Sequence, residues 1–381
     1  MNLRQPPPRN DVTSSGHVGV ATSLARLADN HSHAPSRSLG SGVFARRVLA
    51  LALPLMLSSF IIAGYRDRFN SRRTISQYFN GVYASRVLGR ECVVGIADAF
   101  NKIGSLLWHD TSTGLIVGWM VTNGVAFVIA ALLLYSLSAA KSSALTLVYV
   151  VVIFMMAVSA TVTTPYDFLS YALILAVFIE ATRGSRGRAL LLMILAVATR
   201  ESALLVVPIL ALSFVRPTHD NSASLLQLLR DLRDVVRGER IIWLLTAAGL
   251  TTYATLKIVA MEMGHKLHFV QHVAIGGHLS TAGVLGTLSA LLMVVVLRVV
   301  LRASEGVEAL DRRSTLLWLS ASPYLVVCAG WGIWSEAPRL VMPLLLGEFL
   351  LAVTTAPGRG LRLNVVESTE RSHRPTAISS R

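Results

Sequence analysis

Residues 189–215 read ALLLMILAVATRESALLVVPILALSFV, two apolar runs separated by the polar quartet Thr199-Arg200-Glu201-Ser202. At about 1.5 Å per helical residue, neither 189–199 nor 203–215 reaches across a hydrocarbon core of about 30 Å. The pair therefore predicts either one long tilted helix or two half-helices that meet at the quartet. Irregular backbone in lipid is tolerated only where it lines a cavity or packs on protein, so the break is a candidate site.

Eight further apolar runs flank this pair, and each is long enough to cross a membrane as a helix. They are 48–65, 114–138, 143–161, 166–182, 241–260, 281–301, 315–334 and 339–356. The whole chain is 53% apolar and only 15% charged, with a mean hydropathy of +0.58. A soluble domain carries about 25% charged residues. These features predict an all-α, polytopic transmembrane helical bundle with a re-entrant or broken helix pair.

The distribution of basic residues decides between the two forms of the 189–215 pair. If the pair is a re-entrant hairpin and the N-terminus is cytoplasmic, 24 of the 35 Lys and Arg lie on the cytoplasmic side and 11 outside. A single crossing would instead move the arginine-rich segment 216–240 outside. Cytoplasmic loops favour Lys and Arg, so the hairpin is favoured, with both termini cytoplasmic in the inner (plasma) membrane. The net charge of +14 is thereby explained by the membrane, and no nucleic-acid partner is expected.

Domain boundaries follow from composition. Residues 1–42 are rich in Pro, Ser, Gly and His and predict a disordered cytoplasmic tail, as do residues 357–381. Residues 43–356 form the predicted membrane domain. Its outer loop, 66–113, is too long for a plain connector and shows two amphipathic patterns, typical of helices that lie in the membrane interface. A third amphipathic stripe, from Leu225 to Val236, predicts an interfacial connector on the cytoplasmic side.

Charged residues from distant segments gather on the outer side of this topology. An ionisable group in lipid costs on the order of 3 kcal/mol, so each needs a partner, water or a function. The groups are Asp67 with its neighbours Arg66 and Arg68, Asp167, the hairpin pair Arg200-Glu201, and Glu336 with Arg339. Each also has a structural interpretation. Asp167 could cap a helix, Arg200 could pair with Glu201, and Glu336 could pair with Arg339 one turn away.

Two other features have simpler interpretations. His265, His268 and His272 could share one helical face and hold a divalent metal, but no Cys or carboxylate stands at fitting spacing, so interfacial histidines are favoured. Glu348 lies in the middle of the last run, and we expect it to be buried against a polar neighbour.

Three stretches resemble the C-type (GT-C) glycosyltransferase superfamily. They are Pro165-Tyr-Asp-Phe-Leu-Ser170, Ala196-Val-Ala-Thr-Arg-Glu-Ser-Ala-Leu-Leu205, and Trp334-Ser-Glu-Ala-Pro-Arg339 with Pro343 following. The similarity covers about residues 46–356. It implies a helical bundle whose first outer loop carries a catalytic aspartate, and a polyprenyl-phosphate sugar as the donor. Asp67 matches that aspartate by position, but no Asp-x-Asp or Asp-Glu pair stands there, so a divalent metal stays an open cofactor.

On this hypothesis Asp67, Asp167 and Glu201 are the catalytic carboxylates, since sugar transfer with inversion needs a general base for the acceptor hydroxyl. The substrate-binding groups are Arg66, Arg68, Arg200, Glu336 and Arg339, because arginine binds phosphate oxygens at two points. The expected partners are the lipid-linked donor, an extracytoplasmic acceptor and membrane lipids. Two other hypotheses are a transporter with its site at the 189–215 break and a non-catalytic membrane scaffold.

Overall fold

The computed structural model describes residues 38–69, 85–107, 114–138, 143–159, 166–215, 225–263, 280–303, 307–330 and 337–355. Side chains are described from Val48 to Ala63 in the first of these segments, so those of Arg66, Asp67 and Arg68 lie outside the description. The chain separates into two units, Met1–Leu49 and Ala50–Arg381. The second unit contains every described helix except the beginning of the first.

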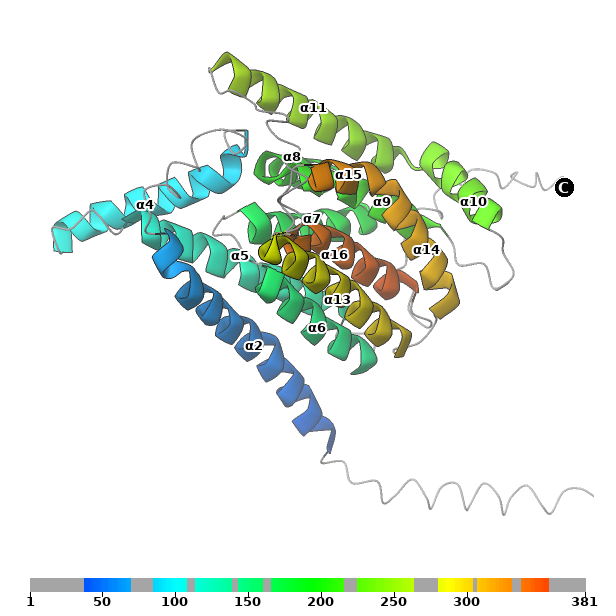
Figure 1. Cartoon of the computed structure of the whole chain (residues 1–381), viewed down its shortest axis with the longest axis horizontal. Coiled ribbons are helices and arrows are strands. Elements are labelled where there is room, and N and C mark those ends of the chain that lie inside the picture. The colour runs from blue at the N-terminus through cyan, green and yellow to red at the C-terminus, as the bar shows by residue number, and fades with distance from the viewer. Residues whose placement is uncertain are drawn as a thin grey trace, which may run out of the picture. The chain divides into compact units, whose positions relative to one another are not determined.

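All described elements are helices, which confirms the all-α prediction (Figure 1). They are α2 (Ser38–Phe69), α4 (Val87–Leu107), α5 (Gly114–Ser138), α6 (Ser143–Ser159), α7 (Tyr166–Thr182), α8 (Arg186–Thr199), the 3-10 helix η2 (Glu201–Leu205), α9 (Val206–Phe214), α10 (Leu225–Gly238), α11 (Arg240–Glu262), α13 (Thr281–Ala303), α14 (Val307–Ser320), α15 (Ser322–Gly330) and α16 (Ala337–Thr355).

Four of the described helices, α5, α11, α13 and α16, are long and apolar enough to cross a membrane, which indicates a membrane protein. The sequence predicts eight such spans outside the 189–215 pair, so the number is lower than expected. Helices α6 and α7 have 17 residues each, about 25 Å at 1.5 Å per residue. The faces of the helices that point away from the bundle carry large apolar side chains. On α13, for example, Leu288, Leu292 and Val295 are exposed, as expected for side chains that meet lipid.

The predicted run 315–334 is divided into two helices, α14 and α15, which meet at Ala321. Pro323 has no backbone N–H and so cannot bond to the carbonyl of Leu319. The Ser322 hydroxyl donates to that carbonyl instead, at 2.7 Å. Proline is well tolerated at the start of a helix, so α15 begins where α14 cannot continue.

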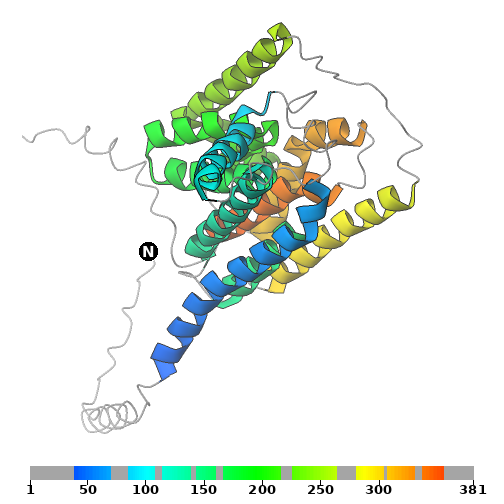
Figure 2. The same ribbon diagram turned by 90° about the vertical axis from the view of Figure 1, so that its left-hand side faces the viewer.

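The core lies between α5, α6, α7, α9 and α16, which pack against one another. Fully buried aromatic rings fill it, among them Phe127, Tyr149, Phe178 and Phe349. Figures 1 and 2 show α11 and α13 on the outside of the bundle, on different sides of it. Helix α11 packs along α8, and α13 packs along α16 and α6.

The 189–215 segment is a hairpin, as predicted. Helices α7 and α16 begin at the same end of the bundle, because the Tyr171 hydroxyl reaches the Arg339 carbonyl. Helix α8 runs back beside α7 to that end, and α9 then runs beside α16 away from it. Further along both helices, a Cβ placed on Gly347 of α16 would lie 3.0 Å from Ile209 of α9. Helices α8 and α9 therefore run in opposite directions, and Arg200 lies at the tip where the chain turns between them.

The second amphipathic pattern of loop 66–113 is confirmed as a helix, α4, while the first lies outside the described residues. Helix α4 is held against α5 by a close backbone approach at Gly118. A Cβ on Gly118 would lie 2.2 Å from the carbonyl oxygen of Val93 and 3.1 Å from the amide nitrogen of Ala97. Because those atoms belong to the backbone, only movement of the whole helix could make room.

Gly118→Ala is expected to destabilise the protein, although alanine is the better helix former. Overpacking of this kind costs about 1–3 kcal/mol, so the thermal unfolding midpoint should fall. Gly95→Ala is the matched control, because a Cβ on Gly95 meets nothing within 4 Å. Equal melting temperatures for the two variants would show that α4 does not need the close approach.

Candidate functional site

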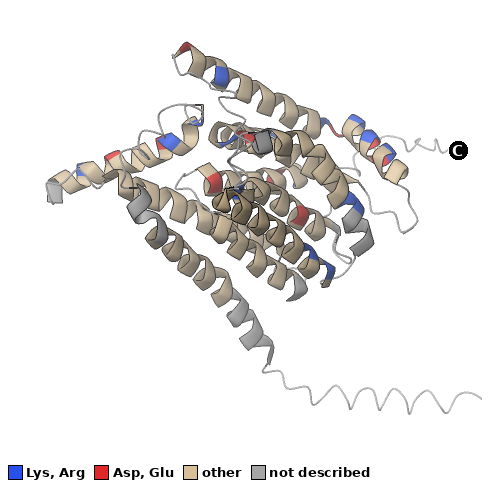
Figure 3. Ribbon diagram, viewed as in Figure 1, with Lys and Arg blue, Asp and Glu red and all other residues tan. Residues whose placement is uncertain are grey.

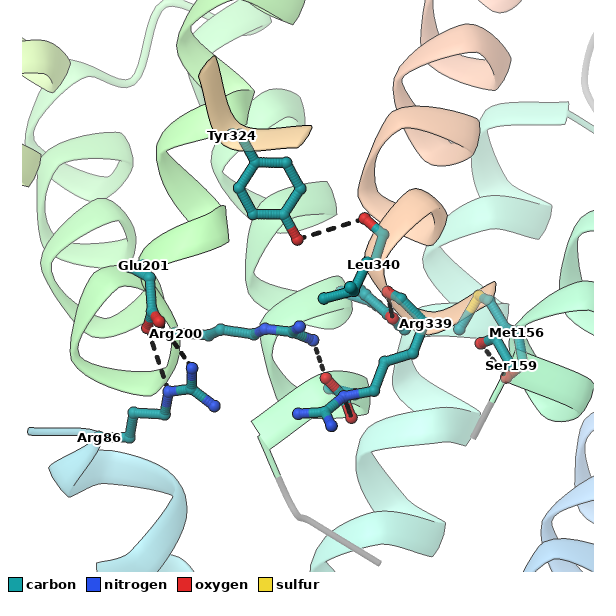
Figure 4. Close-up of polar contacts among 10 residues, drawn as sticks. Arg86, Met156, Ser159, Arg200, Glu201, Tyr324, Arg339 and Leu340 are labelled. Carbon is teal, nitrogen blue, oxygen red and sulfur yellow. Dashed lines mark hydrogen bonds and ion pairs between the residues drawn. The ribbon is translucent and has the colours of Figure 1, made fainter. Parts of the chain in front are cut away.

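The site is built around Asp167, in the first turn of α7, which binds two arginines at once. One carboxylate oxygen, Oδ1, accepts from Nη1 of Arg200, and Oδ2 lies 2.7 Å from Nε of Arg339. All three side chains are buried, with 3–4% of their surface exposed. Asp167 therefore ties the hairpin tip to the first turn of α16. Figure 4 shows the two arginines that it binds, Arg200 and Arg339.

A second, partly buried ion pair joins the tip to the segment before α4. Arg86 donates from Nη2 to Oε1 of Glu201 at 2.6 Å and from Nε to Oε2 at 3.1 Å, a two-point contact. The Arg86 guanidinium also lies 5.6 Å from the centre of the Tyr166 ring, next to Asp167 in sequence. The Glu201 side chain is 27% exposed, far more than that of Asp167. Glu201 is thus the carboxylate of this site that another molecule can reach.

The pairings differ from the structural interpretations of the sequence. Arg200 and Glu201 do not pair with each other, because Arg200 has an extended backbone, with φ −162° and ψ 135°. Successive side chains of an extended segment point to opposite sides. Arg200 accordingly turns to Asp167 and Glu201 turns to Arg86. Asp167 forms ion pairs with arginines rather than serving only as a cap.

Pro343 explains how Arg339 is held in place. Proline has no N–H to donate to the carbonyl four residues earlier, which is that of Arg339. The Tyr171 hydroxyl donates to this carbonyl oxygen at 3.3 Å. The Tyr324 hydroxyl donates to the next carbonyl, that of Leu340, at 3.2 Å (Figure 4). Two tyrosines from α7 and α15 therefore fix the turn that carries Arg339.

Lys257, from α11, adds a further cation that the sequence interpretation missed. Its Nζ donates to the Ser85 hydroxyl at 3.0 Å and lies 5.5 Å from the centre of the Tyr253 ring. Ser85 precedes Arg86, so Lys257 lies beside the Arg86–Glu201 pair. The sequence did point to Lys257, because it is the single charged residue of the apolar run 241–260. Arg86 had no comparable signal, as one of seven basic residues in 66–113.

Among the described groups, the site is more cationic than anionic. The four cations are Arg86, Arg200, Lys257 and Arg339, and the two carboxylates are Asp167 and Glu201. The Ser202 hydroxyl at the tip is also buried and has no hydrogen-bond partner in the described part of the chain. Poorly hydrated positive charge of this kind favours an anionic ligand with oxygen acceptors.

Three sequence predictions lie outside the described residues. These are Glu336, the side chains of Arg66, Asp67 and Arg68, and the histidines of 264–279. Within the described side chains, no group of three or more His, Cys, Asp or Glu could hold a metal ion. The structure therefore brings together Asp167, Arg200, Glu201 and Arg339 of the predicted site.

Glu348 forms a separate polar cluster in α16, and the prediction that it is buried against polar neighbours is confirmed. Its Oε1 accepts from Trp318 Nε1 at 2.7 Å, from Arg298 at 3.1 Å and from the Ser314 hydroxyl. These donors come from α13 and α14. The cluster therefore joins three helices away from the hairpin tip.

Comparison with known proteins identifies no relative: no family model, no curated protein and no solved structure matches this chain. What the fold and site define is an all-α membrane protein with a buried, arginine-rich polar site at one end of its helical bundle.

Proposed function

We propose that this protein is an integral membrane glycosyltransferase that takes a sugar from a polyprenyl-phosphate donor and transfers it to an extracytoplasmic acceptor. The observation that carries the proposal is the convergence of four cations and two carboxylates at the hairpin tip. Such a transferase must hold a lipid phosphate and remove a proton from a hydroxyl group. The similarity to GT-C proteins at 165–170, 196–205 and 334–339 points to the same chemistry.

The residues divide into two tasks. The excess positive charge would bind the donor phosphate and stabilise the charge that develops on it as the sugar leaves. Asp167 would position Arg200 and Arg339 rather than act as a base, because its side chain is buried and each of its two oxygens is engaged by one of these arginines. The general base would be Asp67, as the resemblance implies, or the partly exposed Glu201.

The proposal is tested by turnover. Purified full-length protein in lipid nanodiscs would be incubated with polyprenyl-phosphate sugars that carry a radiolabelled sugar, with added metal ions and with chelator. Release of polyprenyl phosphate is expected as the labelled sugar passes to water or to an added acceptor that carries a hydroxyl group. If donors of several sugar types bind without release, and release stays at the level of empty nanodiscs, the protein is a scaffold with this fold.

The proposed topology places the hairpin tip on the outer face of the plasma membrane and both termini in the cytoplasm, because this arrangement puts 24 of 35 basic residues inside. A membrane-impermeant maleimide applied to intact cells is expected to label Met263→Cys but not Gly187→Cys. Met263 is 68% exposed at the tip end of α11. A Cβ on Gly187, at the other end, meets nothing within 4 Å.

The labelling requires a background without native thiols, so Cys92 and Cys328 are replaced by Ser. Burial and the neighbouring Glu91 raise the pKa of the Cys92 thiol, which slows its reaction but does not prevent it. Labelling of Gly187→Cys alone would reverse the proposed orientation of the bundle.

A further inference from the structure

Helix α10 has apolar side chains on two sides, where the sequence suggested a single stripe. Leu228, Leu232, Val235 and Val236 pack against the hydrophobic core. Leu225, Leu226 and Leu229 are exposed, Leu226 by 67%. The bundle therefore uses only part of the apolar surface of this helix, and a leucine edge is left facing away from it.

Charges on α10 are segregated around this leucine edge. At about 100° per residue, Arg230, Arg233 and Arg237 follow one another on the same side of the helix as Leu226. All three arginines are exposed. The acidic and amide side chains, Gln227, Asp231 and Asp234, occupy the next sector. Around the helix the order is thus protein contact, leucines, arginines and acidic residues. Figure 3 shows that α10 carries both basic and acidic residues.

The position of α10 relates this order to a bilayer. The helix packs on α9 and α11, at the end of the bundle opposite the hairpin tip (Figure 1). Helix α10 follows the end of the apolar helix α9 and precedes the start of the apolar helix α11. This places α10 at the level of the membrane surface. Trp243, in the first turn of α11, is 57% exposed, as is common for tryptophan at this depth.

We propose that α10 is a binding surface for anionic phospholipids. The leucine edge enters the acyl-chain region, and Arg230, Arg233 and Arg237 bind headgroup phosphates beside it. Their aliphatic stems cover apolar surface while the guanidinium groups reach the headgroups. Asp231 and Asp234 face water on the remaining side, away from the lipid phosphates. This surface lies apart from the proposed transferase site and does not depend on it.

The test compares two lipids around the full-length protein in phosphatidylcholine bilayers. Spin-labelled phosphatidylglycerol and spin-labelled phosphatidylcholine report the fraction of each lipid that the protein immobilises. The test variant replaces Arg230, Arg233 and Arg237 by Gln. The matched control replaces Arg183, Arg186 and Arg188 by Gln, which removes the same charge from exposed positions at the same end of the bundle.

We expect wild-type protein to prefer phosphatidylglycerol by about threefold or more at low salt, since each basic residue near the surface attracts anionic lipid. The α10 variant should lose this preference. The control should keep it, because Arg183 and Arg188 already pair with Glu180. High salt should weaken it in both proteins that show it. Equal losses in the two variants, or no preference in wild type, would overturn the proposal.

A second measurement separates lipid from a protein partner on the leucine edge. Leu226→Cys, in the background without native thiols, is expected to be protected from an impermeant maleimide when the protein is in a bilayer. Rapid labelling of this cysteine would place the edge in water and would exclude the lipid surface. Both measurements, the fraction of immobilised lipid and the maleimide labelling, are made on folded protein, so an equal change in the melting temperature of the two arginine variants would not affect the comparison.

Discussion

Asp167→Asn is expected to cause the largest loss of stability of any single change at the site. The substitution leaves Arg200 and Arg339 buried without the carboxylate that compensates them. Breaking a buried ion pair by removing one partner costs about 3–5 kcal/mol. Folded protein recovered after detergent extraction, and its thermal unfolding midpoint, should both fall sharply.

Two comparisons make this result specific. Asp98→Asn changes the same chemical group at an exposed position of α4 and should leave the melting temperature unchanged. Adding Arg200→Gln to Asp167→Asn should recover part of the loss, because one uncompensated charge is removed. If the double variant is less stable than Asp167→Asn alone, the carboxylate is not the compensating group for Arg200.

Asp67→Asn is expected to lower transfer by about a hundredfold or more, the usual effect of losing a general base. On the proposed topology the Asp67 carboxylate follows the first apolar run and meets water, so donor binding and the melting temperature should change little. The measurement is release of polyprenyl phosphate per folded molecule. Full turnover by a well-folded variant would remove Asp67 as the base.

Glu201→Gln is the informative comparison for Asp67→Asn. It replaces the other candidate base by a side chain of the same shape, which can still accept a hydrogen bond from Arg86. Loss of transfer in Glu201→Gln with retained donor binding, alongside full activity in Asp67→Asn, would assign the base to Glu201. Asp98→Asn again serves as the control and should keep wild-type activity.

The hairpin and the convergence of charges from distant segments could be predicted because a bilayer restricts which residues can stand in each part of a membrane protein. Apolar run lengths report which segments leave water, and the side on which Arg and Lys collect reports their direction. These two signals placed Asp167, Arg200, Glu201 and Arg339 at one end, where the structure has them. They contain no information about which charges pair.

The pairings depend on geometry that hydropathy does not express. The extended backbone at Arg200 sends neighbouring side chains to different partners, and no Pro or Gly marks that residue. The division at Ala321 was within reach of the sequence, since Pro323 cannot continue a helix. Arg86 was not, because it meets Glu201, 115 residues later in the chain, through the packing of α4 on α7 and α8.

The two partners of Asp167 reach the membrane at very different times during synthesis. Arg200 follows it by 33 residues, so these two side chains can enter the bilayer together as an ion pair without net charge. Arg339 belongs to the last described helix and arrives only after α11, α13 and α14. Its side chain must then join a carboxylate that is already occupied. We therefore expect the site to be completed when α16 inserts. In a ribosome-bound chain that lacks this helix, the only ion pairs at the hairpin tip described above would be those of Arg200 and Arg86.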